Sequence, residues 1–225
     1  MLKETEFTLH ICDDWIGVDL PDQHHVQTVC HLLEVQSSWI EIIPGLQSLA
    51  VQFDPAQIFA EEAAQLLRSS IKNVDSDVPT SAKTVTIPVC HDEDFAPDLA
   101  MVAEKIGIAP SDFASWHADQ GYRVVLIGFM PGFAYLRSDT AITGLKRLKR
   151  PRQLIPSGSI GMIETQACIY PFSSPGGWPI IGKTPEHLFN PEQSNPALLA
   201  AGDNIKFQSI SRREYEQFVP RSSTL

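Results

Sequence analysis

From Tyr122 onward the apolar residues occur in short runs, and Pro or Gly interrupts them every few positions. These runs suit β-strands better than helices, and the breaks between them are typical of tight turns. The runs are Val124–Ile127, Ile160–Ile163, Ile169–Tyr170, Ile180–Ile181 and Ile205–Ile210. This pattern predicts a β-barrel or β-sandwich with functional loops.

Three elements precede these runs and complete a predicted domain of residues 84–225. Apolar residues alternate around Ile87, as they do in a half-buried strand. Residues 97–106 carry apolar side chains at helical spacing and stop at Gly107, a typical helix end. Residues 110–119 predict a second short helix.

The first part of the chain, residues 1–78, predicts a separate small domain. Strand-like alternation is centred on Leu9, Val18 and Val51. Asp54 and Pro55 can begin a helix over residues 56–68, because an aspartate N-cap is followed by proline at the first helical position. This helix is expected to bury Phe59, Ala63, Leu66 and Leu67. Strand–helix units of this kind predict an α+β sandwich of the ferredoxin-like type.

Residues 69–83 separate these two regions. They hold Ser, Asn, Asp, Pro and Thr and few apolar residues, so we interpret them as a linker. A chain of 225 residues is long enough for two modest domains, each with its own core.

The overall composition is that of a globular protein, with 43% hydrophobic and 20% charged residues. The net charge of −10 argues against nucleic acid or an anionic membrane as a partner. No apolar run approaches the roughly 18 residues needed to span a bilayer, and Met1–Glu6 has no signal-peptide core. Four scattered cysteines without a C-x-x-C pair fit a reducing compartment. We therefore expect a cytoplasmic protein.

One basic run, residues 146–152, departs from this acidic balance. A short charge run is usually a solvated loop. The alternative is a patch that binds a carboxylate, a phosphate or an acidic partner. The run alone leaves both interpretations open.

The histidines and cysteines do not predict a metal site. None of the seven histidines pairs with another at a spacing of three or four residues. Cys90 and His91 are neighbours on a predicted strand, so their side chains point to opposite faces. We therefore expect no metal site in this chain.

Residues 177–184 read Gly-Trp-Pro-Ile-Ile-Gly-Lys-Thr, which fits the phosphate-loop pattern G-x-x-x-x-G-K-T. A phosphate loop needs small residues and free backbone N–H donors. Here the interior is bulky and β-branched, and proline removes one donor. A turn, not an apolar strand, precedes it, so the match is interpreted as accidental.

Two aromatic segments are better candidates for a site. Residues 128–135 read Gly-Phe-Met-Pro-Gly-Phe-Ala-Tyr, and residues 170–178 combine a Pro-Gly turn with three aromatic side chains. Aromatic side chains with glycines are typical of an apolar pocket that a ligand approaches closely. A packed core turn is the alternative for each segment.

Ordered motifs extend over nearly the whole chain from about residue 10. They are Pro44–Leu49, Phe53–Pro55, Phe95–Leu99, Ile127–Leu136, Pro151–Arg152, Pro156–Gly161, Gln166, Ile169–Pro171, Ser174–Trp178 and Ile181–Pro185. In this order they closely resemble the family of the B-type subunit of bacterial 5-oxoprolinase, the carboxyltransferase subdomain C and D type. That family also includes the sporulation histidine-kinase inhibitor and the proteins called allophanate hydrolase subunit 1. Related sequences form half of the carboxyltransferase domain of urea carboxylase.

The resemblance implies a fold and a function. The implied fold is a small α+β N-terminal domain followed by a cyclophilin-like β-barrel. The implied function is ATP-dependent opening of 5-oxo-L-proline to L-glutamate, by an amidohydrolase in which this chain is not autonomous. The implied partners are a related barrel subunit and a third subunit, and ATP is expected to bind to the assembled complex.

This chemistry needs cations for a carboxylate and a phosphate, and donors for developing charge. Arg152 could hold an anion through paired hydrogen bonds, helped by Lys183 and Thr184. Gln166 and Tyr170 could hydrogen-bond the ring amide. The expected apolar wall consists of Phe129, Pro131, Phe133 and Trp178. An ordinary ion pair is the alternative for Arg152 and a core position for Trp178, and no residue is assigned a catalytic role.

Two other functions remain open within the same family. One is an inhibitor of a sporulation-type histidine kinase, and the other is a carboxyltransferase or allophanate-hydrolase-type subunit of urea metabolism. The chain also departs from the family pattern at several positions. Lys183 stands where arginine is usual, Ala167 where Thr or Ser is favoured, and Glu164 where glycine is common. The changes at 164 and 167 are expected to lie in the pocket.

Overall fold

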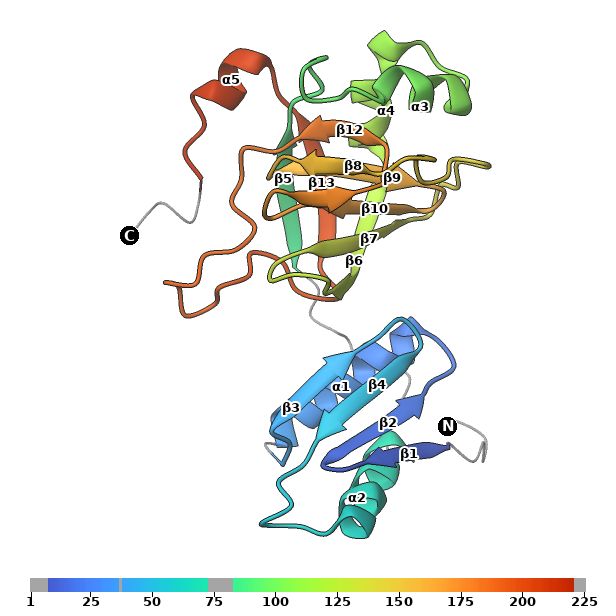
Figure 1. Cartoon of the computed structure of the whole chain (residues 1–225), viewed down its shortest axis with the longest axis vertical. Helices are drawn as coiled ribbons and strands as arrows, with labels where there is room; N and C mark the ends of the chain where they lie inside the picture. Colours follow the sequence, from blue (N-terminus) through green and yellow to red (C-terminus); the bar gives the residue numbers. More distant parts are fainter. Residues whose placement is uncertain (1–7, 37, 73–82, 221–225) are drawn as a thin grey trace. The chain divides into compact units, whose positions relative to one another are not determined.

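The computed structural model of the chain describes residues 8–36, 38–72 and 83–220. It divides into two compact units, Met1–Ser81 and Ala82–Leu225, and each has its own hydrophobic core (Figure 1). Within the described ranges, no helix is long and apolar enough to cross a membrane.

The first unit is an antiparallel sheet covered by two helices. Its strands lie in the order β1-β2-β4-β3, with the bounds β1 Leu9–Cys12, β2 Trp15–Asp19, β3 Glu41–Pro44 and β4 Ser48–Gln52. The helices are α1 (Gln23–Gln36) and α2 (Ala60–Lys72). Because side chains alternate along a strand, β2 and β4 turn one row of apolar residues toward the helices: Ile16, Val18, Leu49 and Val51. This small α+β unit is the one that the sequence predicts.

Helix α2 differs from the prediction at both ends. It begins at Ala60 rather than residue 56, so Phe59 lies before it and is 76% exposed instead of buried. It also extends four residues beyond 68 into the predicted linker, because Ile71 continues the buried face of Ala63 and Leu67. The linker interpretation is therefore wrong for residues 69–72, and residues 73–82 lie outside the described part.

The second unit is a barrel, as predicted, and the structure shows that a seven-stranded sheet forms it. The strand order is β12-β9-β10-β7-β6-β13-β5. The bounds are β5 Thr84–Val89, β6 Gly121–Ile127, β7 Ala134–Ser138, β9 Ser159–Ile163, β10 Gln166–Ile169, β12 Ile180–Lys183 and β13 Asn204–Ser209. Backbone N–H groups of Cys90 and Lys183 each donate to the other residue's carbonyl oxygen, at 2.9 and 3.0 Å. This bridge joins the end of β5 to the end of β12 and closes the barrel.

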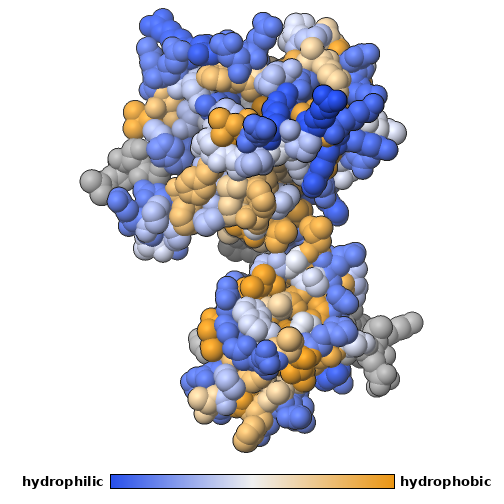
Figure 2. All heavy atoms as spheres, in the orientation of Figure 1, coloured by the Kyte–Doolittle hydropathy of each residue, from blue (hydrophilic) through white to orange (hydrophobic). Residues whose placement is uncertain are grey.

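Several short strands and helices lie outside the seven-stranded sheet of the barrel. Strands β8 (Arg152–Ile155) and β11 (Ser174–Gly176) form a separate ribbon. Between β5 and β6 lie α3 (Leu99–Ile106), the 3₁₀ turn η1 (Pro110–Asp112) and α4 (Phe113–Asp119), and α5 (Arg212–Glu216) follows β13. Figure 1 shows α3, α4 and α5 at the same end of the barrel. Over this end the surface is largely hydrophilic, whereas a more apolar area lies lower on the same unit (Figure 2).

Two histidines contact each other at this end of the barrel. His117 on α4 is fully buried and stacks on Phe207, with ring centroids 4.4 Å apart. Its Nδ1 lies 3.1 Å from Nε2 of His91, so one of these nitrogens donates a hydrogen bond to the other. Burial lowers the pKa of His91 from 6.5 to about 4. The pKa of His117 is also well below its usual value, because of burial first and the neighbouring His91 second.

The histidine pair predicts a pH dependence of stability. The unfolded chain takes up protons on these histidines near pH 6.5 and the folded chain does not, so acid favours unfolding. We expect this part of the unfolding free energy to be fully present above pH 6.5 and to fall as the pH drops toward 4. Urea unfolding between pH 7 and pH 4 measures it, and His91→Phe should make the decline less steep. Equal slopes for the two proteins would contradict the prediction.

Gly161 on β9 is required by close packing. A Cβ atom at this position would lie 2.7 Å from Trp178 Cβ and 3.0 Å from Cys168 Sγ, both closer than normal contact. Gly121 on β6 is different, because a Cβ there would meet nothing within 4 Å. The two glycines therefore form a matched pair for a stability test.

We expect Gly161→Ala to lower the unfolding free energy by about 1–3 kcal/mol, because the added methyl group forces Trp178 or Cys168 to move. Gly121→Ala should change it by no more than about 0.5 kcal/mol. Chemical denaturation of both variants checks the difference, and similar values for the two would show that Gly161 is not tightly packed.

Candidate functional site

A small cavity of about 270 Å³ opens where β5 and β12 are bridged. This volume is close to the lower limit of small-molecule sites. The bridge brings Lys183 against the segment that follows β5, while β8 supplies the facing wall. The lining includes Phe95, Pro97, Arg152, Ile155, Ser159 and Lys183. We call this cavity the Lys183 groove.

Asp98, just before α3, fixes Arg152 in the wall of the groove. The Arg152 guanidinium donates two hydrogen bonds to the Asp98 carboxylate, at 2.8 and 2.9 Å. The same carboxylate accepts the Ile180 backbone N–H at 2.7 Å, and the Asp98 N–H donates to the Ile180 carbonyl oxygen. The Asp98 side chain is 12% exposed and that of Arg152 is 32% exposed. Arg152 thus directs two of a guanidinium's five N–H donors at Asp98, and the other three remain for further contacts.

Lys183 presents a cation that no carboxylate neutralises within the described ranges. Its ammonium lies 5.2 Å from the ring centroid of Phe95 and 5.9 Å from that of Tyr215, which are cation–π distances. Burial lowers the pKa of Lys183, and the nearby Arg212 lowers it further. A bound anion would relieve both effects, so the Lys183 side chain is suited to hold a carboxylate or a phosphate group.

Arg212, in contrast, is surrounded by carboxylates. Its guanidinium stacks on Phe95 at 4.2 Å from the ring centroid. It lies 3.5 Å from Asp92, 3.3 Å from Asp94 and 2.7 Å from Glu216. Arg212 therefore holds α5 beside the groove through these ion pairs, whereas the Lys183 ammonium can pair with an anionic ligand.

An aromatic cluster packs behind the groove. Phe133 meets the ring of Tyr170 edge-on at 5.0 Å, and Trp178 packs in the same cluster. Ile155 belongs both to this cluster and to the groove lining. The Tyr170 hydroxyl is hydrogen-bonded to the Cys168 thiol, and burial raises the pKa of both groups, so they stay protonated. These side chains support the groove wall from within.

The structure brings only some of the predicted site residues together. Arg152 and Lys183 line the Lys183 groove. The rings that we expected in a pocket wall or on a ligand, those of Phe133, Tyr170 and Trp178, are at most 5% exposed and belong to the core. Trp178 thus occupies a core position, as the alternative interpretation expected. Arg152 forms the alternative ion pair, but Arg152 also lines the groove and can still contact a ligand there.

The remaining predicted residues lie away from the groove lining. Phe129 is 68% exposed and has a φ of 76°, an unusual backbone conformation for a phenylalanine. Pro131 is exposed in the same loop. Gln166 begins β10 opposite Arg137, and Thr184 is buried, where its Oγ1 accepts the Glu186 backbone N–H.

Two further expectations are corrected. Glu164 is exposed at the turn between β9 and β10 with a φ of 41°, and Ala167 is fully buried in the barrel core. Neither lines the groove, so these departures from the family pattern lie outside it. The glycine that is common at position 164 is explained by the left-handed backbone of this turn.

Sequence reasoning did not single out Asp98, Phe95, Arg212 or Tyr215 as site residues. The motif Phe95–Leu99 was visible in the sequence, but the partner of Asp98 lies 54 residues away. In the described part of the chain, no group of three His, Cys, Asp or Glu side chains is arranged to hold a metal ion.

The family of the carboxyltransferase domain, subdomain C and D, matches residues 6–199 of this chain. The chain belongs to this family. Two proteins that are similar to this chain are named as the B-type subunit of 5-oxoprolinase. That of Bacillus subtilis (strain 168) is 34% identical over 195 residues, which cover 82% of this chain and 81% of the relative. That of Escherichia coli O157:H7 is 33% identical over 190 residues, with 84% and 87% covered.

Solved structures agree with the carboxyltransferase-domain fold. The conserved uncharacterized protein PH0987 from Pyrococcus horikoshii is 31% identical and covers 92% of this chain and 100% of its own, with a TM-score of 0.56. The urea amidolyase of K. lactis is 17% identical with a TM-score of 0.71 over 96% of this chain and 16% of that protein. This second likeness concerns the fold alone.

The Asp98–Arg152 pair predicts a clear effect of substitution. We expect Asp98→Asn to lower the unfolding free energy by about 1–3 kcal/mol, because the half-buried guanidinium of Arg152 loses its charged acceptor. Asp139→Asn, at an exposed aspartate, should change it by no more than about 0.5 kcal/mol. Thermal or urea unfolding measures both variants, and equal effects would show that Asp98 does not hold the groove together.

Proposed function

We propose that this chain is the B-type subunit of a 5-oxoprolinase-type complex, which opens 5-oxo-L-proline to L-glutamate with ATP. The proposal is supported by relatives of that name, each matched over more than four fifths of its length. The observation that carries it in the chain itself is the Lys183 cation, which lacks a carboxylate partner in the described residues and faces a small groove. 5-Oxoproline is small and carries one carboxylate, which fits both properties.

The residues of the groove can bind and orient this substrate. Lys183 would hold the carboxylate, and Ile155, Pro97 and Phe95 offer apolar contacts to the ring. Arg152, positioned by Asp98, would direct its remaining N–H donors at the lactam oxygen or at a phosphoryl group transferred to it. Such a transfer from ATP would leave ADP and activate the ring carbon for attack by water. Cleavage of the C–N bond would then free the amino group and leave an acyl phosphate on the opened chain. A second water would hydrolyse this acyl phosphate to glutamate and inorganic phosphate.

ATP and the partner subunits belong to the proposed complex rather than to this chain alone. The segment that fits the phosphate-loop pattern contains strand β12, which pairs with β9 and leads into the barrel-closing bridge. A paired strand cannot wrap its backbone N–H groups around a triphosphate. We therefore propose that the assembled complex binds ATP, with a related barrel subunit and a third subunit as partners.

The proposal is tested by co-expression of this chain with its candidate partner subunits and measurement of glutamate released from 5-oxoproline and ATP. A well-formed complex that releases no glutamate would overturn the proposed function. A complex that releases glutamate at a rate requiring this chain would support it.

Within an active complex, Lys183→Met should raise the KM for 5-oxoproline about tenfold or more, because a charged hydrogen bond is lost. Lys183→Arg, which restores the residue usual in the family, should keep the KM close to that of the parent chain. Lys206→Met removes an exposed lysine on β13 and serves as the charge control. An unchanged KM in Lys183→Met would remove Lys183 from the substrate site.

A further inference from the structure

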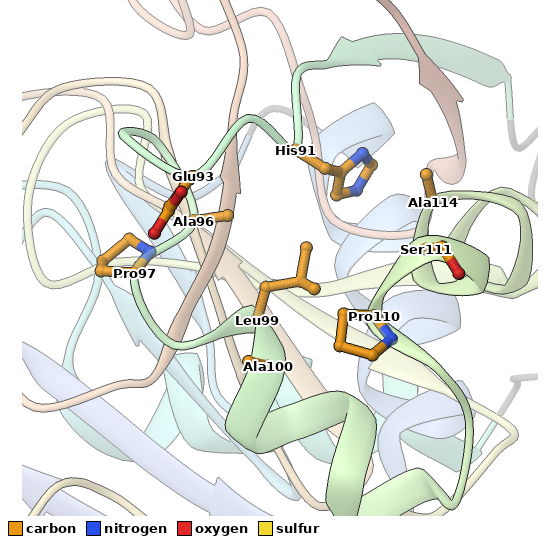
Figure 3. Close-up of a pocket in the computed structure, with 9 residues that line it drawn as sticks. All are labelled: His91, Glu93, Ala96, Pro97, Leu99, Ala100, Pro110, Ser111 and Ala114. Carbon is orange, nitrogen blue, oxygen red and sulfur yellow. The ribbon is translucent and has the colours of Figure 1, made fainter.

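A second cavity, of about 740 Å³, lies next to the Lys183 groove. Its volume is within the range of small-molecule sites. Figure 3 shows its walls, which come from the segment after β5, the first turn of α3, η1 and the start of α4. Most of the lining is apolar: Ala96, Pro97, Leu99, Ala100, Pro110 and Ala114. We call it the His91 cavity.

The segment 91–97 forms a wall of both cavities and divides its side chains between them. His91 and Glu93 line the His91 cavity, whereas Asp94 and Phe95 line the Lys183 groove. Arg212 pairs with the aspartates on either side of Glu93. Glu93 forms no ion pair with any described residue, and the His91 cavity has no Lys or Arg in its lining. Glu93 thus supplies a single negative charge to a mainly apolar cavity.

The imidazole of His91 forms a polar but uncharged part of the cavity lining. Its ring is held by the hydrogen bond to His117 and by an edge-on contact with Phe113, at 5.8 Å between centroids. Its Nδ1 is buried, with no hydrogen-bond partner among the described residues. The pKa of His91, lowered to about 4 by burial, keeps the imidazole uncharged at neutral pH. A cation in the cavity would therefore meet attraction from Glu93 and no repulsion from His91.

We propose that the His91 cavity is a second small-molecule site, which takes a primary amine with an apolar body. The ammonium group pairs with Glu93, which lies beside Pro97 at one end of the cavity in Figure 3. The apolar body lies against Leu99 and Pro110, farther along the same cavity. The two cavities share only Pro97 in their linings, so this site does not depend on the proposed function.

Benzylamine and benzyl alcohol are matched probes for this site, because they share an apolar ring and differ in charge. We would titrate each into the full chain and follow the methyl NMR signals of Leu99, Ala100 and Ala114. Benzylamine should shift these signals and bind up to about fivefold more tightly than benzyl alcohol, the range of a solvent-accessible ion pair. Equal affinities, or the absence of shifts at these methyl groups, would overturn the proposal.

Two neighbouring substitutions separate Glu93 from general charge effects. Glu93→Gln should abolish the preference for benzylamine and leave benzyl alcohol binding unchanged. Asp92→Asn removes the same charge one residue away, on the side of Arg212, and should keep the preference. If both variants lose the preference equally, the attraction comes from the acidic surface as a whole and the assigned site is wrong.

Discussion

The pairing of Asp98 with Arg152 and Ile180 holds the end of the barrel together. It joins the start of α3 to β8 and β12, across 54 and 82 residues of sequence. Both side chains of the ion pair are only partly exposed, so the charges are partly desolvated and gain little net energy from each other. The value of the pair lies in geometry, because two parallel hydrogen bonds fix the plane of the guanidinium. The wall of the Lys183 groove is therefore set before any ligand arrives.

The closure of the barrel has a similar role for Lys183. The backbone bridge to Cys90 ends β12 against the segment that follows β5, and this contact places the ammonium between Phe95 and Tyr215. Arg212 is close enough to lower the pKa of Lys183 but directs its own hydrogen bonds to carboxylates. Arg212 thus has a structural role, whereas the Lys183 ammonium remains available to a ligand. This difference between the two cations supports an anionic substrate for the groove.

Local patterns predicted the elements better than the site. The helix that ends at Gly107 was visible because glycine adopts the required φ of 82° at little cost. The phosphate-loop match is rejected from the sequence because its interior is bulky and proline removes one N–H donor, and the structure shows that Ile180 and Ile181 form a strand. The aromatic residues are harder to assign, because the segment that contains Tyr170 and Trp178 fits a packed core as well as it fits a ligand pocket. Whether such a ring meets solvent depends on which strands pair far along the chain, and local sequence patterns do not reveal that pairing.

The turn that follows β5 ties the charge of two cavities to one short segment. The backbone N–H groups of Phe95 and Ala96 both donate to the Asp92 carbonyl oxygen, so residues 92–96 form a tight turn. Asp92 and Asp94 contact Arg212 from this turn, whereas Glu93 lines the His91 cavity. An insertion in the turn would therefore shift the carboxylates of both cavities together, without altering any residue that lines them.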